Sequence, residues 1–451
     1  MKVQAIRPLK VAVIGSGISG LSCAWLLSQQ HQVTLFEKDD RLGGHSNTVQ
    51  LKLGNDSTAV DTGFIVYNPV NYPNLVRFFD TLGIESRATE MSFSVSLDGG
   101  RLEYSGTGLS GLLAQRRNLV RPQFWSLIRN LLRFYRESSG YCRNPDLAEL
   151  TLGDLLKQEK YSRAFIDDHL LPMGAAIWST PVDQMLDYPA QAFLRFCQNH
   201  GLVQLSDRPE WRTVTGGSRQ YVDRVGAILR QRGDIRLNSR IHRIVRRLGR
   251  VELEFLHGER EVYDEVVLAC HADQALALLH QPTSDEQQLL GAFEYQRNTA
   301  VLHSDPALMP ARPGAWASWN YLAEGTQPRS RALSVTYWMN RLQHLPESLP
   351  LFVTLNPLRE PAEGSIHRSF LYQHPVFNLG ALAAQQRLWQ LQGHRNTWFC
   401  GAYFGYGFHE DGLQSGLAVA EALGGVPRPW TLEAPNDRIH VDNPLPRRSV
   451  A

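Results

Sequence analysis

A glycine-rich turn near the N-terminus is the feature that most constrains how this chain can fold. Residues 11–14 form a short apolar run, residues 15–20 read Gly-Ser-Gly-Ile-Ser-Gly, and an apolar stretch follows from Leu21 to Leu27. This order predicts a buried strand, a tight turn and a helix. In a G-x-G-x-x-G turn the first glycine permits the turn, the second lets the backbone approach a pyrophosphate, and the third lets the helix pack closely on the strand.

A second strand and an acidic residue complete the pattern of a dinucleotide-binding unit. Residues 32–36 are expected to form a strand that ends at Glu37, 22 residues after Gly15. An acid at this place accepts hydrogen bonds from an adenosine ribose, and the helix N-terminus offers free N–H groups to the phosphates. Glycine-rich turns also serve packing alone, but the complete order of strand, helix, strand and acid favours nucleotide binding. We therefore expect an α/β fold in which the nucleotide contacts Gly15, Gly17, Ile18, Ser19, Gly20 and Glu37.

The overall composition argues against several other classes of protein. Hydrophobic residues make up 43% and charged residues 20%, as in ordinary globular proteins. The 46 basic and 44 acidic side chains leave a net charge of +2, which gives no field for holding a nucleic acid. The five cysteines contain no C-x-x-C pair and the histidines lack ligand spacing, so no disulfide framework and no metal site are predicted. Residues 11–27 look superficially like a secretory signal, but their glycine spacing and the strand that follows argue against one, and the cysteine pattern fits a reducing cytoplasm.

The residues that begin at Glu37 narrow the choice of cofactor. Residues 37–44 read Glu-Lys-Asp-Asp-Arg-Leu-Gly-Gly, which has the form E-x-x-x-R-x-G-G. This string resembles the flavin-binding signature of the superfamily of flavin amine oxidases, protoporphyrinogen oxidases and phytoene desaturases. The resemblance implies FAD, held noncovalently by a Rossmann-like domain of the glutathione reductase type with an inserted α+β substrate domain. It adds these expected FAD contacts: Lys38, Arg41, Gly43, Gly44, His45, Asp61, Thr62, Gly63, Ile244, Gly401, Asp411 and Gly412.

Longer strings resemble one group within that superfamily. This group is the bacterial predicted NAD/FAD-binding proteins that are often found with cyclopropane fatty acid synthases. The strings that carry the resemblance are residues 44–48, 176–179, 316–321, 337–343 and 354–357. The resemblance also implies a division of the chain: a discontinuous FAD-binding domain (8–70, 210–285 and 395–425), a substrate domain (71–209 and 286–394) and a C-terminal extension (426–451), which its prolines predict to be poorly ordered.

Two departures from the superfamily are visible, and one of them is His45, which stands where many relatives have arginine after the double glycine. The other bears on the reaction. Amine oxidases of this fold commonly place a lysine near flavin N5, but no lysine follows Lys160 in this chain. This speaks against amine oxidation of the usual kind. Cys400 precedes a glycine and suggests a covalent flavin thioether, although a cysteine on a buried strand is more often a small core residue.

The loop at residues 403–412 carries the strongest candidates for catalysis, because the resemblance places it at the flavin edge. We expect His409 to act as a general base near its ordinary pKa of about 6.5, with Glu410 or Asp411 orienting it, and Tyr406 and His45 as further catalytic candidates. The alternative is that the acidic residues cap the last helix or bind the ribityl chain. Weaker candidates are Tyr67 and Asn68 for substrate contact, Trp316, Trp319 and Trp338 for an apolar pocket or for core packing, and His303 with Asp305 for an ion pair or a loop turn.

Residues 110–136 stand out by their charge, since they contain six arginines and no acid. From Pro122 onward, helical periodicity places Phe124, Ile128, Leu131, Leu132 and Tyr135 on one face and Arg129, Arg133 and Arg136 on the other. This pattern is typical of a basic amphipathic helix on an anionic membrane surface and equally of an ordinary surface helix.

These observations together predict an FAD-dependent oxidoreductase. We expect it to oxidise an apolar small-molecule or lipid substrate by hydride transfer to flavin N5, and the group resemblance implies a fatty acyl lipid. The alternatives are an amine or carotenoid-type substrate on the same fold, or a non-catalytic flavin-binding partner of a lipid-modifying enzyme. We expect it in the cytoplasm, with peripheral contact at the inner membrane face through residues 110–136.

Overall fold

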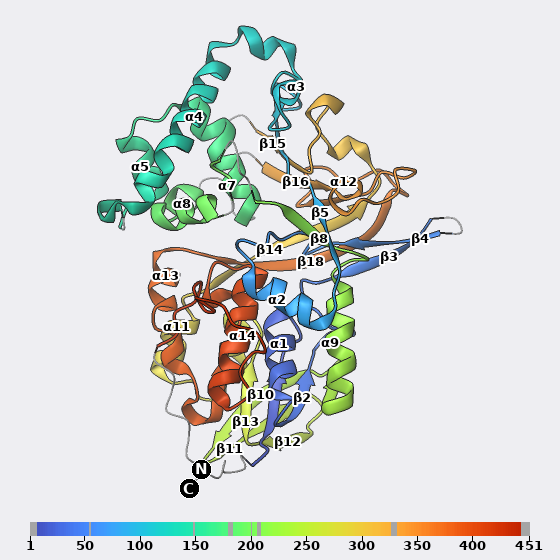
Figure 1. The fold of residues 1–451 in the computed structure, drawn as a ribbon, viewed down its shortest axis with the longest axis vertical. Helices are drawn as coiled ribbons and strands as arrows, with labels where there is room; N and C mark the ends of the chain where they lie inside the picture. Colours follow the sequence, from blue (N-terminus) through green and yellow to red (C-terminus); the bar gives the residue numbers. More distant parts are fainter. Residues whose placement is uncertain are drawn as a thin grey trace.

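The computed structural model describes residues 7–53, 56–147, 149–178, 184–199, 201–204, 209–325 and 332–442. A parallel five-stranded sheet forms the centre of the lower domain in Figure 1, with the strand order β19-β13-β1-β2-β9. Its strands are β1 (Lys10–Ile14), β2 (Gln32–Phe36), β9 (Asp234–Arg236), β13 (Glu265–Leu268) and β19 (Thr397–Phe399). The strand order reverses between β1 and β13, so a crevice for ligands lies at the carboxyl ends of these two strands.

Three helices cover one face of this sheet, and a small antiparallel sheet packs behind it (Figure 1). The helices are α1 (Ile18–Leu27), α9 (Arg219–Arg232) and α14 (His409–Leu423); the small sheet consists of β10 (Ile241–Arg247), β11 (Arg250–Phe255) and β12 (Arg260–Tyr263). Every residue of α1 is buried. Close packing explains this: a Cβ on Gly416 of α14 would lie 2.3 Å from the Ser19 carbonyl oxygen of α1. The predicted Rossmann-like core is therefore present.

A seven-stranded sheet forms the base of the upper domain, in the order β18-β14-β17-β16-β15-β6-β7. All neighbours are antiparallel except β15 and β6, which are parallel. Its strands are β6 (Phe93–Leu97), β7 (Leu102–Ser105), β14 (Glu294–His303), β15 (Trp319–Glu324), β16 (Ala332–Trp338), β17 (Phe352–Leu355) and β18 (Ile366–Val376). Two short pairs join the domains, β3 (Thr48–Leu53) with β4 (Asp56–Asp61) and β5 (Ser86–Thr89) with β8 (Trp211–Val214).

Helices form the rest of the upper domain. They are α3 (Leu109–Leu112), α4 (Pro122–Arg143), α5 (Leu152–Gln158), α6 (Arg163–Phe165), α7 (Leu171–Trp178), α8 (Ala190–Asn199) and α12 (Met339–Gln343). Residues 166–170 form a π-helical turn between α6 and α7, and π turns of this kind often occur at functional sites. Residues 179–183, and with them Ser179 of one family-like string, lie outside the described residues.

Helix α4 begins at Pro122 as predicted, but its apolar face differs from the prediction. Leu127 and Phe134 are buried, whereas the side chain of Leu132 is 46% exposed. The helical periodicity of the sequence could not predict which side chains of α4 are buried, because α4 packs on α6 and α8 on one side and lines a cavity on another.

Two helices that we assigned to the substrate domain pack on the nucleotide-binding layers. Helix α2 (Pro73–Leu82) places Phe78 in contact with Trp25 of α1, with ring centroids 5.2 Å apart. Helix α13 (Leu379–Gln385) binds the site loop, because the Gln385 amide donates to the Tyr403 carbonyl at 2.9 Å. Helices α10 (Ala272–Leu278) and α11 (Ser284–Leu290) complete this domain.

The prediction of a poorly ordered C-terminal extension is wrong for residues 426–442. Arg428 is buried and binds Glu421 through Nε at 2.9 Å and through Nη2 at 2.9 Å. Arg438 forms a buried ion pair with Asp411, with 2.6 Å between Nε and Oδ1. These acids lie on α14, so this part of the extension is fastened to the nucleotide-binding domain. Residues 443–451 lie outside the described residues.

Candidate active site

A single cavity of about 1700 Å³ extends from the crevice between β1 and β13 into the upper domain. Pockets for small ligands usually measure about 300–1,000 Å³, so this volume has room for a dinucleotide and a substrate together. Its lower end is lined by the turn after β1, the end of β2 and residues 239–242 before and within β10. This is the position that the strand order predicts for a nucleotide.

The glycine turn has the shape that a pyrophosphate requires. Gly15 has φ +103°, which favours glycine, and a Cβ there would lie 2.6 Å from the Ala269 carbonyl oxygen. Gly17 lines the cavity, and a Cβ on it would meet no atom within 4 Å. The backbone at Gly17 is therefore open to the cavity, where α1 begins and its N–H groups are free for phosphate oxygens. These residues fit the FAD that the sequence predicts.

Glu37 is held in place at the end of β2. Its Oε2 accepts hydrogen bonds from the Ser16 N–H at 2.9 Å and the Ser16 hydroxyl at 2.6 Å, and its Oε1 accepts one from the Asp39 N–H at 3.0 Å. The carboxylate is buried yet lines the cavity. It is thus fixed beside the glycine turn, as an adenosine-binding acid must be.

Most residues that we predicted to contact FAD line this cavity. They are Gly15, Gly17, Ile18, Ser19, Glu37, Lys38, Arg41, Gly43, Gly44, His45, Thr62, Gly63 and Gly401. Gly20 lies behind the lining and serves packing, since a Cβ there would lie 1.9 Å from the Gly15 carbonyl oxygen. Ile244 also lies outside the lining, and its strand reaches the cavity through residues 239–242 instead.

Asp61 lies outside the cavity lining as well, where it joins separate segments of the chain. Its carboxylate accepts hydrogen bonds from Thr48 at 2.6 Å, from the Ser218 hydroxyl at 2.7 Å and from the Gln343 amide at 2.8 Å. Burial raises the pKa of Asp61 to about 6 despite these donors. In this position Asp61 holds the strand that leads to Thr62 and Gly63, which both line the cavity.

Asp411 and Gly412 have structural contacts on α14. Asp411 accepts a hydrogen bond from the Phe408 N–H at 2.7 Å, which caps the helix, and it pairs with Arg438. A Cβ on Gly412 would lie 2.8 Å from the Ile18 side chain, so this glycine allows α14 to approach α1. Asp411 therefore caps the last helix, which is the alternative that the sequence analysis gave for it.

His409 lies in the cavity, as predicted, but its partners differ from those we expected. Its Nε2 is 2.8 Å from the Ser46 hydroxyl and 3.3 Å from the Tyr221 hydroxyl, and its ring stacks on Phe64 with centroids 3.8 Å apart. Glu410 is occupied elsewhere, because it accepts hydrogen bonds from Asn74 and the Leu75 N–H. Burial, helped by the nearby His45, lowers the pKa of His409 to about 3. The expected ionisation near 6.5 is thus corrected, and His409 is a neutral imidazole near pH 7.

His45 belongs to a cluster that sequence reasoning missed. Its ring lies 5.3 Å from His374 and 6.2 Å from His271, and it stacks on Tyr372 at 5.1 Å. All four residues line the cavity. Burial lowers the pKa of His45 to about 4 and those of His271 and His374 to about 3. Nε2 of His45 is buried and has no hydrogen-bond partner among the described residues.

The upper part of the cavity is apolar. It is lined by Met91, Phe93, Tyr104, Leu112, Leu131, Tyr135, Met173, Ile177, Phe196, Trp319 and Tyr337. His169, on the π-helical turn, also lines this part, and burial lowers its pKa to about 4. Lys38 is the single lysine in the lining formed by the described residues, and it lies at the nucleotide end.

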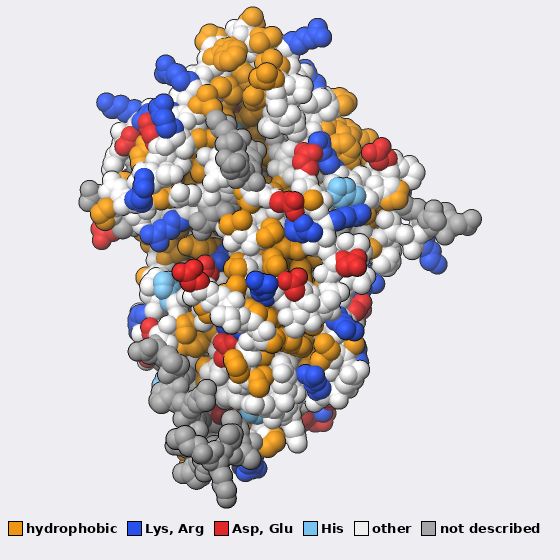
Figure 2. Space-filling view, viewed as in Figure 1, with side chains coloured by type: hydrophobic (Ala, Val, Ile, Leu, Met, Phe, Trp, Pro, Cys, Tyr) orange, Lys and Arg blue, Asp and Glu red, His pale blue; other side chains and the backbone are white. Residues whose placement is uncertain are grey.

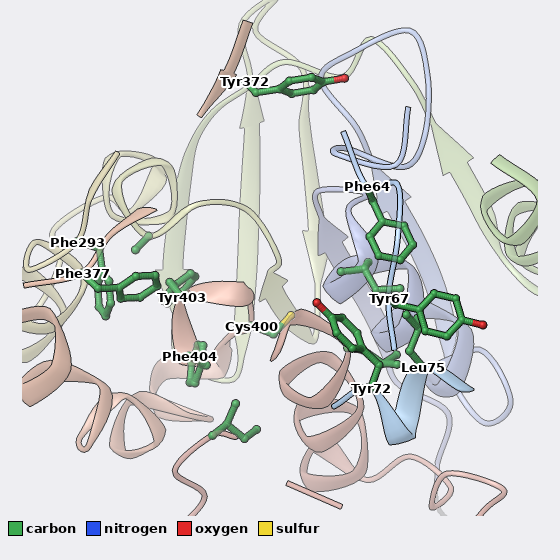
Figure 3. Packing of buried hydrophobic residues seen from close by; sticks show 14 of the residues in the cluster. Phe64, Tyr67, Tyr72, Leu75, Phe293, Tyr372, Phe377, Cys400, Tyr403 and Phe404 are labelled. Atoms are coloured by element: carbon green, nitrogen blue, oxygen red, sulfur yellow. The ribbon is translucent and has the colours of Figure 1, made fainter. Parts of the chain in front are cut away.

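The remaining candidates divide between the cavity and the core. Tyr406 lines the cavity, with the Arg438 guanidinium 5.5 Å from its ring centre. Tyr67 and Asn68 are buried outside the lining, and Tyr67 donates to Ser86. Figure 3 shows Cys400 between two groups of aromatic side chains, with Tyr72 on one side and Tyr403 and Phe404 on the other; the thiol is a buried core group outside the cavity lining.

Trp316 and Trp338 pack edge to face, 5.4 Å apart, outside the cavity, so only Trp319 of the three tryptophans lines it. His303 and Asp305 form a loop turn, since the Asp305 carboxylate caps the N–H of Ala307. Within the described ranges, no group of three His, Cys, Asp or Glu residues is arranged to hold a metal ion. Within the same ranges, no helix has both the length and the apolar character to cross a bilayer.

Comparison with known families agrees with this geometry. The model of the family described as flavin containing amine oxidoreductase matches residues 18–424. The chain belongs to this family. Its members are FAD-dependent oxidoreductases, so the match confirms the superfamily and the cofactor that the glycine motifs predicted.

Individual relatives of the family vary in what they are named for. A 15-cis-phytoene desaturase of Solanum lycopersicum is 27% identical over 256 residues, which cover 53% of this chain and 42% of that protein. The chain thus spans less than half the length of this relative. Two solved structures share the fold over 92% of this chain: a CLA-producing fatty acid isomerase from P. acnes (16% identity, TM-score 0.62, 98% of that chain) and a cyclohexylamine oxidase from Brevibacterium oxydans (15% identity, TM-score 0.64, 99% of that chain).

Proposed function

We propose that this protein uses FAD to oxidise a long apolar substrate, and that a fatty acyl lipid is the substrate class that suits its cavity best. The observation that carries the proposal is the apolar upper part of the cavity, which is continuous with the nucleotide end. A pocket of this kind stabilises an alkyl or alkenyl chain through the hydrophobic effect and excludes water from the reacting carbon. When bound, FAD supplies a hydride acceptor at flavin N5.

The residues of the chain itself would orient the substrate and control its protons. His409 is fixed by Ser46, Tyr221 and the Phe64 ring, so it presents one ring orientation to the cavity. Because burial lowers its pKa to about 3, it is unprotonated near neutral pH, so it can accept a hydrogen bond or act as a weak proton acceptor. The neutral imidazole of His45 offers a second proton acceptor or hydrogen-bond partner.

The charges around the upper cavity favour an uncharged substrate over an amine. Of the acids there, Glu90 pairs with Arg341 and Glu210 pairs with Arg212. Neither is left to hold a substrate ammonium. The chain also has no lysine after Lys160, and amine oxidation of the usual kind would need one near N5. Among the named relatives, a fatty acid isomerase and a phytoene desaturase support the apolar class, and a cyclohexylamine oxidase supports the amine class.

A carotenoid-type polyene is the second candidate, because the phytoene desaturase relative matches half of this chain and the same apolar walls would accept a polyene. A role as a non-catalytic flavin partner and an association with a cyclopropane fatty acid synthase remain predictions of the sequence resemblance.

Anaerobic flavin reduction separates these candidates. The FAD-loaded protein is mixed without oxygen with an unsaturated or cyclopropane phospholipid in detergent, with a carotenoid-type polyene, or with a polyamine or monoamine. We expect the flavin absorbance to bleach with the acyl lipid and to persist with the amines. Bleaching by the polyene alone would replace the acyl assignment, and rapid peroxide production from a polyamine in air would contradict both apolar candidates.

A further inference from the structure

The far end of the upper domain carries an unusual group of exposed apolar side chains. We call the end formed by residues 109–132 the apolar tip. Five of the twelve large exposed hydrophobic residues in the described ranges lie in this stretch of 24 residues: Leu109 (78% exposed), Leu119 (47%), Val120 (82%), Trp125 (50%) and Leu132 (46%). Figure 2 shows hydrophobic surface gathered at the top of the molecule, over the α3 and α4 end, with basic side chains beside it. A contiguous apolar patch on a protein surface marks an interaction site.

The arginines of the tip form no ion pairs with acids of the described residues. Among the described residues, no ion pair is recorded for Arg116, Arg117, Arg121 or Arg129. Arg117 and Arg121 both donate to the backbone carbonyl of Arg101, which collects their positive charge in one place. Partial burial, and then the neighbouring guanidinium groups of Arg117 and Arg101, lower the pKa of Arg121. An external anion would relieve this repulsion.

Arg133 differs from these four residues. Its guanidinium pairs with Glu137 at 2.9 Å and with Glu159 at 3.1 Å, and it lies over the Tyr161 ring. It therefore faces the protein, which differs from the position that the membrane-helix alternative gave to Arg133. The interacting surface is the tip at the start of α4, rather than a helix that lies flat on its apolar side.

The cavity opens at this tip. Leu109 and Leu112 of α3 and Leu131 and Tyr135 of α4 line the cavity. Leu109 does so while 78% of its surface is exposed to solvent, so it marks a mouth of the cavity; Leu371, which is 61% exposed, also lies in the lining. The apolar patch, the unpaired arginines and the cavity mouth thus share one end of the molecule.

We propose that the apolar tip docks on an anionic lipid bilayer, with Val120 and its apolar neighbours inserted among the acyl chains and the tip arginines at the headgroup phosphates. A bilayer surface satisfies both features at once, because hydrocarbon lies directly beneath a layer of negative charge. The mouth at Leu109 then faces the bilayer, and, on the basis of the proposed function, a lipid chain enters the cavity without crossing water. The docking itself needs no turnover.

Vesicle flotation of the FAD-loaded protein tests the proposal. The vesicles contain phosphatidylcholine alone or phosphatidylcholine with phosphatidylglycerol. We expect binding to the anionic vesicles that weakens as salt is raised. Removal of charge in R116Q/R117Q/R121Q should weaken binding about fivefold for each arginine at the headgroups, or about a hundredfold in all. Val120→Ser should weaken it further at any salt concentration, because insertion of an apolar side chain is not screened.

Matched variants at the opposite end of the molecule serve as controls. R224Q/R230Q/R232Q removes three exposed arginines from α9, and Leu248→Ser changes a fully exposed leucine in the turn between β10 and β11. Both should bind the anionic vesicles as the unchanged protein does. Trp125 gives a second measurement: brominated lipid should quench part of the tryptophan fluorescence, and Trp125→Phe should remove that part.

Three results would overturn the proposal. They are equal binding to neutral and anionic vesicles, equal losses in the tip and control variants, or self-association in solution that Val120→Ser abolishes, which would make the tip an interface between copies of this chain. Retained FAD in each variant shows that the variant is folded. If the protein does not bind vesicles but lipid still bleaches its flavin, the proposed function stands without the docking. If the protein binds anionic vesicles but lipid does not bleach its flavin, the docking stands without the proposed function.

Discussion

A substitution at Gly17 should change the affinity for the cofactor while leaving the stability of the fold nearly unchanged. Its backbone has φ −64° and ψ 179°, which alanine adopts without strain, and a Cβ there would meet no protein atom within 4 Å. Gly17→Ala therefore has two small and opposite effects on folding. The loss of glycine's freedom in the unfolded chain stabilises by about 0.4–1 kcal/mol, and the poorer helix N-cap costs a comparable amount. We expect the stability of the apoprotein to change by less than about 1 kcal/mol.

The same methyl group points into the cavity, where the phosphates would approach the start of α1. Loss of one charge-assisted hydrogen bond to a phosphate costs about 1.5–3 kcal/mol, so the Kd for FAD should rise roughly 10- to 100-fold. Denaturant unfolding of the apoprotein gives the first quantity, and titration of FAD followed by its fluorescence gives the second.

Gly140→Ala is the control for this pair of measurements. Gly140 is exposed on α4, and a Cβ there would also meet no atom within 4 Å. This variant should gain up to about 1 kcal/mol of stability from helix propensity, with unchanged FAD affinity. The reasoning is refuted if Gly17→Ala binds FAD as tightly as the unchanged protein, or if it unfolds the apoprotein.

Three further predictions concern α14 and the buried histidines. His409→Ala should slow flavin reduction by roughly 10² without loss of FAD if His409 is the general base; stopped-flow rates should show no inflection near pH 6.5, since its pKa is about 3. In the unfolded chain His374 binds a proton near pH 6.5, whereas in the folded chain it does so only near pH 3, so the stability of the apoprotein should fall as the pH drops from 6.5 toward 4. In urea unfolding, His374→Gln should make this dependence of stability on pH less steep. The control His257→Ala changes an exposed histidine and should leave the pH dependence unchanged. Arg438→Met leaves Asp411 buried without its partner and should cost about 3–5 kcal/mol, most of which Asp411→Asn should restore in the double variant; equal stability of the unchanged protein, the single variant and the double variant would contradict a buried ion pair.

The parts of the fold that local patterns encode could be predicted from the sequence. The strand, glycine turn, helix and second strand that end at Glu37 are adjacent along the chain, and each has its own pattern. The Gly43 and Gly44 turn follows within a few residues and lies on the cavity as expected.

The histidine cluster could not be predicted, because long-range pairing assembles it. His271 follows β13, whereas Tyr372 and His374 come from β18, whose register against β14 places His374 opposite Gln296. No local spacing connects these residues to His45. One weak signal existed: His271 directly follows the strand that returns to the glycine turn, where side chains usually face the ligand.

The prediction that the C-terminal extension is poorly ordered was wrong for a related reason. Its prolines suggested a loose segment, but Arg428 and Arg438 are held by Glu421 and Asp411 of the preceding helix. Composition cannot show which acids such arginines will meet. Likewise, the six arginines near α4 revealed a basic region, but only the three-dimensional contacts separate the paired Arg133 from the unpaired Arg117 and Arg121.

The order of strands in the parallel sheet has a consequence for synthesis of the protein in the cell. Strand β1 leaves the ribosome first, but its sheet is completed by β19 at residues 397–399, and α14 covers α1 only after residue 409 has emerged. Until then, the growing chain presents an unpaired edge on β13 and the apolar surface of α1, both of which invite aggregation. The crevice wall at Gly401 is also missing, so FAD can be captured in full only after residues 397–423 have emerged. A nascent chain of this protein should therefore need protection by chaperones until these residues have emerged, and a ribosome that stalls before residue 397 should release a product that added flavin cannot rescue.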